Sequence, residues 1–181
     1  GSVPVWTYAL GGALLEKRVW MRHGSNSTGL RYTLRRAASP VRLQLKLLVN
    51  YRGHHALTRA GGWRFDVQPV GRGLRIQAYE GAVPYFALSD AGAWRSAHSW
   101  HYNFELAAER ERGLDAIEDH LHAGSLALTL EPGASASLWI STEEDAGLSS
   151  HDSMEARMAR DASLLAAFPE PDFPPMVRRR S

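Results

Sequence analysis

The sequence predicts a mainly β protein: an antiparallel β-sandwich followed by a C-terminal helix and a proline-rich linker. Apolar and polar residues alternate along most of the first two thirds of the chain, which is the period of a half-buried strand. Short turns rich in Gly and Pro separate these segments, as in antiparallel hairpins. Near the C-terminus the apolar spacing changes to that of a helix. Repeated hairpins are most simply arranged as a sandwich.

Composition limits the possible functions. The chain has 181 residues, 44% of them hydrophobic and 22% charged, which suits one domain with a real core. It contains no Cys, so disulfides and Cys-ligated metal sites are excluded. The net charge of +2 is spread along the chain, and no apolar run has the length of a membrane span. We therefore expect a cytoplasmic protein with no nucleic-acid or membrane partner.

The first strands follow from alternation and turn chemistry. Strands are predicted at 5–10 and 13–21, because Gly11-Gly12 between them can adopt the positive φ angles of a tight hairpin. The next strand, 30–36, has apolar residues on one face. The strongest strand signal lies in 41–52, where every second residue is apolar or aromatic. These residues are Val41, Leu43, Leu45, Leu47, Val49 and Tyr51.

Two more hairpins are predicted further along the chain. One joins 63–70 to 74–80, with Pro69 restricting its first strand to a strand end or an edge of the sheet. The other joins 125–130 to 136–141 through the turn Glu-Pro-Gly-Ala.

The segment 94–122 shows no clean period. It predicts an ordered loop, held by aromatic residues and containing a short helix near 107–112.

The end of the chain has helical spacing. Residues 151–168 predict a helix whose apolar face contains Met154, Met158, Leu165 and Phe168. Residues 169–175, rich in Pro, predict a linker. We therefore divide the chain into a β-sandwich domain at 3–145 and a helix with its linker at 146–181.

A polar cluster follows the strongest strand, and its side chains are costly to bury without partners. They suit a solvated loop, a metal site or a ligand surface; for a sugar, aromatic faces and planar polar groups are the typical contacts. The cluster comprises Asn50, Tyr51, Arg52, His54, His55, Arg59 and Trp63.

Metal binding has one candidate. His120 and His122 would point the same way from a strand, a spacing used by cupin-type metal proteins. The Glu that those proteins need three to four residues later is missing, since Leu126 and Ala127 stand there. We keep a free-standing, cupin-like metal-binding β protein as the alternative function, but we expect no cofactor.

Acidic residues offer a second candidate chemistry. Glu118 and Asp119 lie beside His120, while Glu109 and Glu111 alternate with arginines. A carboxylate pair can hydrolyse a glycosidic bond if one member is protonated, but neighbouring Arg residues lower carboxylate pKa values. An ion-pair network is favoured instead, and the sequence contains no complete active site.

Five blocks, in order, resemble the N-terminal region of bacterial and archaeal glycogen debranching enzymes of the amylo-α-1,6-glucosidase type. The resemblance runs from about Val5 to the end of the chain. The blocks are LEKRVWMRHGSNST, VRLQLKLLVNYRGHH, GWRFDV, NFELAAERERGLDAIEDHLHAG and LEPGASASLWISTEE.

The resemblance implies a β-supersandwich packed against a downstream (α/α)6 barrel that hydrolyses α-1,6-linked branches. The catalytic carboxylates are then expected beyond Ser181, and none is assigned to this chain. Relatives of this type have further residues before the block that begins at Val3, which implies that this chain is incomplete at its N-terminus. Sheet edges left unpaired by that truncation would favour self-association.

On this basis, the polar residues are expected to hold the two domains together or to contact glycogen or a maltooligosaccharide. Domain contact is favoured, since Arg–carboxylate pairs suit an interface. The predicted interface or glucan-contacting residues are Asn50, Tyr51, Arg52, His54, His55, Trp63, Arg110, Glu111, Arg112 and Asp119.

Overall fold

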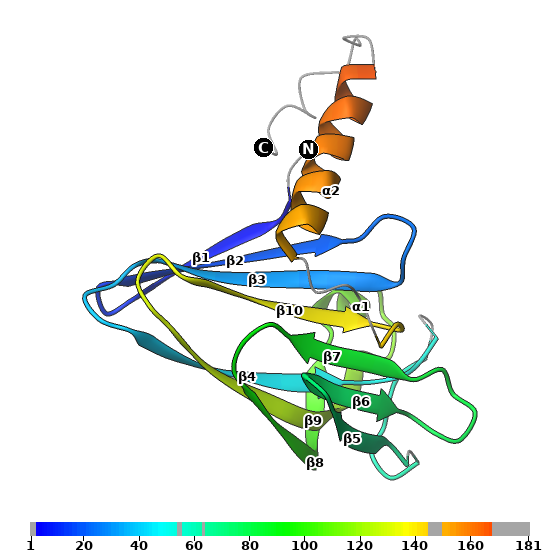
Figure 1. The fold of residues 1–181 in the computed structure, drawn as a ribbon. Coiled ribbons are helices and arrows are strands. Elements are labelled where there is room, and N and C mark those ends of the chain that lie inside the picture. Colours follow the sequence, from blue (N-terminus) through cyan, green and yellow to red (C-terminus); the bar gives the residue numbers. More distant parts are fainter. Residues whose placement is uncertain (1–2, 54–55, 63, 145–149, 168–181) are drawn as a thin grey trace.

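A computed structural model of the chain describes residues 3–53, 56–62, 64–144 and 150–167 (Figure 1). In them, two antiparallel sheets and two helices are formed, which confirms the predicted mainly β, sandwich-like fold. The larger sheet has the order β1 (Val5–Leu10), β2 (Ala13–Met21), β3 (Ser27–Arg36), β10 (Ser135–Ser141), β7 (Tyr85–Ser89), β6 (Gly73–Gln77) and β5 (Asp66–Val70). The smaller has the order β4 (Val41–Val49), β9 (Ile117–Leu130) and β8 (Ala93–Glu105). The helices are α1 (Ala107–Glu111) and α2 (Ser150–Ala167).

The main core lies between the two sheets. Leu34 of the large sheet packs in one cluster with Leu126 of the small sheet, and Leu74 packs in another with Leu121. Alternation in β4 follows the prediction, because Leu43 and Val49 are buried while the polar residues Gln44 and Lys46 between them are exposed. Burying one such side chain stabilises the fold by about 1.5–3 kcal/mol.

Two predicted hairpins are confirmed. β1 and β2 pair around Gly11 and Gly12, whose φ angles of 53° and 89° a side-chain-bearing residue would rarely adopt. β5 and β6 also pair, and β5 is an edge strand. Pro69 is tolerated there because it has no backbone N–H to donate to a further strand.

The predicted hairpin between 125–130 and 136–141 is wrong. The first segment belongs to β9 in the small sheet, whereas β10 inserts between β3 and β7 in the large one. The turn pairs with β3 instead, since Gly133 donates to the Leu34 carbonyl at 2.7 Å. Alternation identifies a strand, but it does not identify the neighbour of that strand.

The loop predicted at 94–122 is also wrong for most of its length. β8 and the first part of β9 form a long antiparallel pair. The short helix expected near 107–112 is confirmed as α1, which connects these two strands. The register of this pair shifts between Ser96 and Ser99 and again between His101 and Phe104. Such bulges interrupt the two-residue period, so the sequence shows no clean strand pattern there.

The outer face of the large sheet carries α2 (Figure 1). Met154 is buried against Trp20 and Trp139, and the Trp20 indole N–H donates to the Ser153 hydroxyl at 3.1 Å. Of the predicted apolar face, however, Met158 and Leu165 are exposed, because α2 rises away from the sheet after its first turns. Phe168 and the predicted linker 169–175 lie outside the described residues.

The edge strands are β1 and β5 in the large sheet, and β4 and β8 in the small one. Self-association through such edges stays a prediction, as does the domain boundary near residue 145. Neither helix of the described part of the chain has the length and apolarity needed to cross a membrane.

Candidate functional site

Most of the predicted polar residues that the structure describes gather at one end of the small sheet. β4 ends at Val49, which pairs with Leu121, so the segment after β4 runs beside the start of β9. α1 joins β8 to β9 at this same end, where the Leu106 N–H donates to the Ala116 carbonyl at 2.7 Å. The sheet therefore brings together residues about 60 positions apart. His54, His55 and Trp63, also predicted here, lie outside the described residues.

Glu118 is the centre of this arrangement. Arg52 donates to both of its carboxylate oxygens, from Nε at 2.7 Å and from Nη2 at 3.2 Å, and the Asn50 amide donates at 3.3 Å. Glu118 is only 2% exposed. A buried carboxylate requires a cation and further donors, and here two residues of the polar cluster supply them. Arg52 and Asn50 are thus occupied in holding Glu118.

His120 lies on the same face of β9 as Glu118. Its Nε2 is 3.6 Å from Glu118 Oε1, and its ring meets the Phe104 ring edge-to-face at a centroid distance of 4.5 Å. His122 is hydrogen-bonded to the Ser125 hydroxyl at 2.9 Å, and burial together with the nearby Lys46 lowers its pKa. Among the residues that the structure describes, no three His, Asp or Glu side chains come together in a way that could hold a metal ion.

Asp119 points to the other side of β9, where its carboxylate binds the backbone of two neighbouring segments. Its Oδ2 accepts the backbone N–H of Ala60 and its Oδ1 that of Asn103, each at 2.9 Å. Asn103 has a φ of 60°, which a side-chain-bearing residue rarely adopts, and it lies in the second bulge of β8. The two N–H groups hold the pKa of Asp119 below its ordinary value. The role visible for Asp119 is structural.

We expect Asp119→Asn to lower the melting temperature by several degrees at pH 7, because an amide cannot accept both backbone hydrogen bonds. Since the folded-state pKa is depressed, the carboxylate stabilises the fold above the unfolded-state pKa of about 3.9 and loses this effect as the pH falls further. The gap between wild type and variant should therefore narrow below about pH 4. Thermal unfolding followed by circular dichroism from pH 7 to 3 measures this gap. Asp115→Asn is the control, and a gap that stays constant with pH would contradict the assignment.

The charged residues around α1 are paired locally. Arg110 pairs with Glu105, and Arg112 with Glu109 at 3.1 Å. These contacts correspond to the ion-pair network that the sequence favoured over a catalytic carboxylate pair. Tyr51 instead packs against the core, with its ring edge-to-face with that of Tyr79. It is therefore part of the framework beneath the site.

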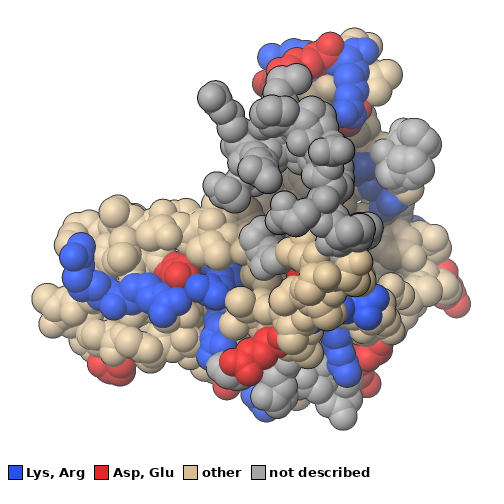
Figure 2. All heavy atoms as spheres, turned by 90° about the horizontal axis from the view of Figure 1, so that it is seen from above, with Lys and Arg blue, Asp and Glu red and all other residues tan. Residues whose placement is uncertain are grey.

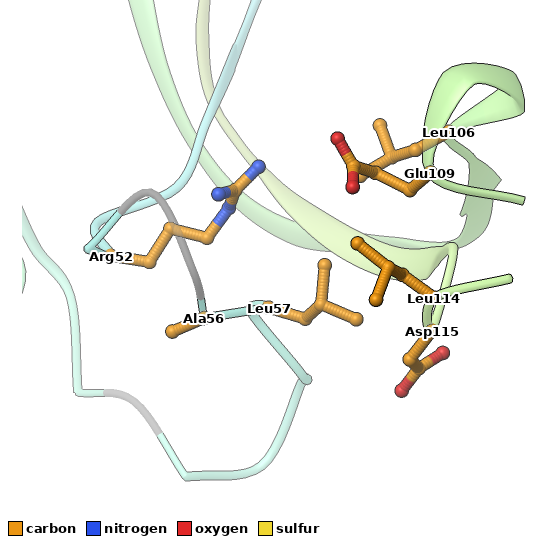
Figure 3. A pocket seen from close by; sticks show the side chains of 7 residues that line it. All are labelled: Arg52, Ala56, Leu57, Leu106, Glu109, Leu114 and Asp115. Atoms are coloured by element: carbon orange, nitrogen blue, oxygen red, sulfur yellow. The ribbon is translucent and has the colours of Figure 1, made fainter. Parts of the chain in front are cut away.

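A cleft of about 250 Å³ lies between the segment after β4 and the α1 region (Figure 3). Leu57 approaches it from one side, and Leu106 and Leu114 from the other. Charged side chains surround these leucines, namely Arg52, Glu109 and Asp115. The result is a small apolar hollow with a charged rim at the end of the sheet.

Comparison with known protein families gives a match over residues 2–137, to the family described as "Glycogen debranching enzyme N terminal". This is about three quarters of the chain, and it extends from β1 into β10, so it contains the cleft and the Glu118 cluster. The chain belongs to this glycogen debranching enzyme N-terminal family. The resemblance inferred from the five sequence blocks is thereby confirmed. A search of curated proteins gave no match.

For this debranching-enzyme N-terminal domain, sequence reasoning missed Glu118 and the three leucines of the cleft, Leu57, Leu106 and Leu114. Glu118 was considered only as one of a carboxylate pair, yet its position two residues before His120 places both on one strand face. Leu106 and Leu114 carried no signal, because they flank a charged segment without periodic spacing. Only the pairing of β8 with β9 brings the leucines to the cleft.

Proposed function

We propose that the chain is the non-catalytic N-terminal domain of a glycogen debranching enzyme of the amylo-α-1,6-glucosidase type, and that the end of its small sheet packs on the catalytic domain of the same protein. The observation that carries this proposal is the cleft, where Leu114 is 58% exposed beside Leu57 and Leu106. We extend the proposal to a cytoplasmic location.

The chemistry of the cleft favours a protein contact over a glucan contact. Protein interfaces combine an apolar centre with a charged or polar rim, which describes the three leucines and their surroundings. Sugar sites typically place an aromatic face against the ring. Among the residues that the structure describes, those that line this cleft include no aromatic side chain. Glucan contact is therefore secondary in the proposal.

The arginines divide into two roles. Arg52 holds the buried Glu118, so its contribution to an interface is to fix the shape of the rim. Arg110 on α1 and Arg112 directly after α1 are largely exposed although each has a carboxylate neighbour, and a guanidinium fork can still receive a partner carboxylate. Leu114 and the exposed face of α1 are therefore the parts we expect to meet the catalytic domain.

The variant Leu114→Asp tests this proposal. We expect association between the two domains, measured by titration of separately expressed parts, to weaken at least tenfold, because a carboxylate would be desolvated in an apolar contact. Val83→Asp is a matched control, since Val83 is also 58% exposed but lies in the connection between β6 and β7. Equal affinities for both variants and wild type would contradict the interface.

Maltooligosaccharide titration of the isolated chain tests the alternative that the cleft binds glucan. We expect a Kd no tighter than about 1 mM. Micromolar binding that Leu114→Asp abolishes would instead assign the cleft to the glucan.

A further inference from the structure

The outer face of the large sheet carries a second hollow, far in sequence from the cleft. Cross-strand pairing aligns Glu16 with Thr33 and Ser135 in one row, and Arg18 with Arg31 in the next. Their neighbours Leu15 and Leu34 are buried between the sheets, so these polar side chains point outward. They line a groove of about 230 Å³. Figure 2 views this face and shows basic side chains in a row with an acidic one among them.

A β-bulge adds a third arginine to the groove. Leu14 pairs with Arg36 but Leu15 with Leu34, so Arg35 is the extra residue on β3. Arg35 donates to both oxygens of Glu16, at 2.8 and 3.2 Å, and Arg18 donates to Oε1 at 2.7 Å. Partial burial tends to raise the pKa of Glu16, but these hydrogen bonds outweigh it and the pKa is lowered. Among the described residues that line the groove, three cations and one carboxylate give a net charge of +2.

Arg31 contributes a buried donor to this group. Its Nε is buried, and within the described part of the chain this atom has no hydrogen-bond acceptor. A buried donor left unpaired is costly, and native structures rarely retain one without a ligand, an ion or a water. Nearby, the Thr33 and Ser135 hydroxyls lie 2.8 Å apart and supply further hydrogen-bonding groups. Met154 at the start of α2 also lines the groove.

We propose that this groove, the Arg31 groove, binds a phosphate group, either as inorganic phosphate or as the phosphate monoester of a small sugar. Guanidinium groups bind phosphate through paired N–H donors, and hydroxyls complete such sites. The volume is below the range typical of drug-sized ligands, so a small anion fits better than a large one. The site lies on the opposite sheet from the cleft, and its test is independent of the domain-interface proposal.

The test uses the 181-residue chain, with inorganic phosphate, glucose 6-phosphate and glucose as probes. We expect saturable binding of at least one phosphate probe by calorimetry, and none of glucose. In ¹H–¹⁵N spectra the Arg31 Nε–H resonance should shift on addition of that phosphate probe. Arg31→Met should weaken binding at least tenfold, because it removes the charged donors and keeps the apolar stem. Arg42→Met removes the same charge from an exposed position on β4 and should leave binding unchanged.

The outcomes either distinguish free phosphate from a phosphate ester or overturn the proposed site. A response to inorganic phosphate alone assigns the groove to the free ion, whereas tighter binding of glucose 6-phosphate assigns it to the ester. Binding of neither probe at 10 mM, on the order of a 10⁻² M affinity limit, overturns the proposal. So does equal weakening by Arg31→Met and Arg42→Met, which identifies an adventitious ion only. If Arg31→Met does not fold, the Nε–H shift in the wild type decides: no shift during phosphate addition overturns the site.

Discussion

Replacing Arg52 with Met is expected to lower the free energy of unfolding by about 3–5 kcal/mol, because the variant leaves the Glu118 carboxylate buried without its cation. The Met side chain keeps most of the apolar stem of Arg, so the loss reports the charge and its hydrogen bonds. Urea unfolding at pH 7 measures the difference. A decrease below about 1 kcal/mol would contradict the role given to Arg52.

A matched comparison is provided by a second arginine. Arg110 also forms an ion pair, with Glu105, but both side chains are largely exposed. Arg110→Met should therefore cost no more than about 1 kcal/mol. The double variant Arg52→Met/Glu118→Leu should recover much of the stability that Arg52→Met loses, because it removes the isolated charge. If the double variant is less stable than Arg52→Met, a further donor such as Asn50 dominates the cluster.

This prediction also changes how the interface should be tested. Replacing Arg52 in the full enzyme would weaken the fold of the domain itself, so a loss of domain association could not be assigned to the interface. Leu114 is the better probe, since its side chain is exposed and its replacement leaves the Glu118 cluster intact.

The local part of the fold could be predicted from the sequence. Gly11-Gly12 has turn chemistry that joins two neighbouring strands, and the alternation at 41–49 fixed which face of β4 is buried. Sheet membership could not be predicted, because the end of β9 (125–130) and β10 are adjacent in sequence and alternate equally well, yet they belong to different sheets. A crossover depends on the long-range pairing of β10 with β3 and β7, which a local pattern does not encode.

The site was predicted in part, for the same reason. Polar residues such as Asn50 and Arg52 were recognisable because they follow an apolar strand. Their partner Glu118 lies 66 positions from Arg52, in a region where bulges disturb the period. The Arg31 groove had no local signal either, since Arg18, Arg31 and Arg35 come from two strands and a bulge.

The second large effect is expected from Trp20→Ala, which should lower the free energy of unfolding by about 3–5 kcal/mol. Trp20 is 3% exposed on the outer face of the large sheet and meets Trp139 edge-to-face, at a centroid distance of 5.3 Å. Gly29 makes room for this packing, since a Cβ there would lie 2.5 Å from the Trp20 ring. Removing the indole therefore leaves a cavity that the sheet backbone cannot close.

A tryptophan on the neighbouring strand provides the control. Trp6 on β1 is 46% exposed, and the Lys17 ammonium lies over its ring, 5.3 Å from the ring centroid. Trp6→Ala should cost about 1 kcal/mol or less, because exposed cation–π contacts are weak. Denaturant unfolding of both variants measures the contrast, and equal losses would contradict the packing described for Trp20.

Trp20→Ala should also release α2, because the helix contacts the sheet near its start. The indole N–H bonds Ser153, and Met154 packs in the same cluster, whereas Met158 and Leu165 are exposed further along. Limited proteolysis should therefore cut within residues 150–167 of Trp20→Ala under conditions where wild type and Trp6→Ala stay intact. Ser153→Ala removes the hydroxyl that accepts the indole N–H and should cost about 0.5–1.5 kcal/mol. If Trp20→Ala is destabilised but α2 stays protected, contacts other than the indole hold the helix, and the direction in which α2 leaves the domain is not set by Trp20.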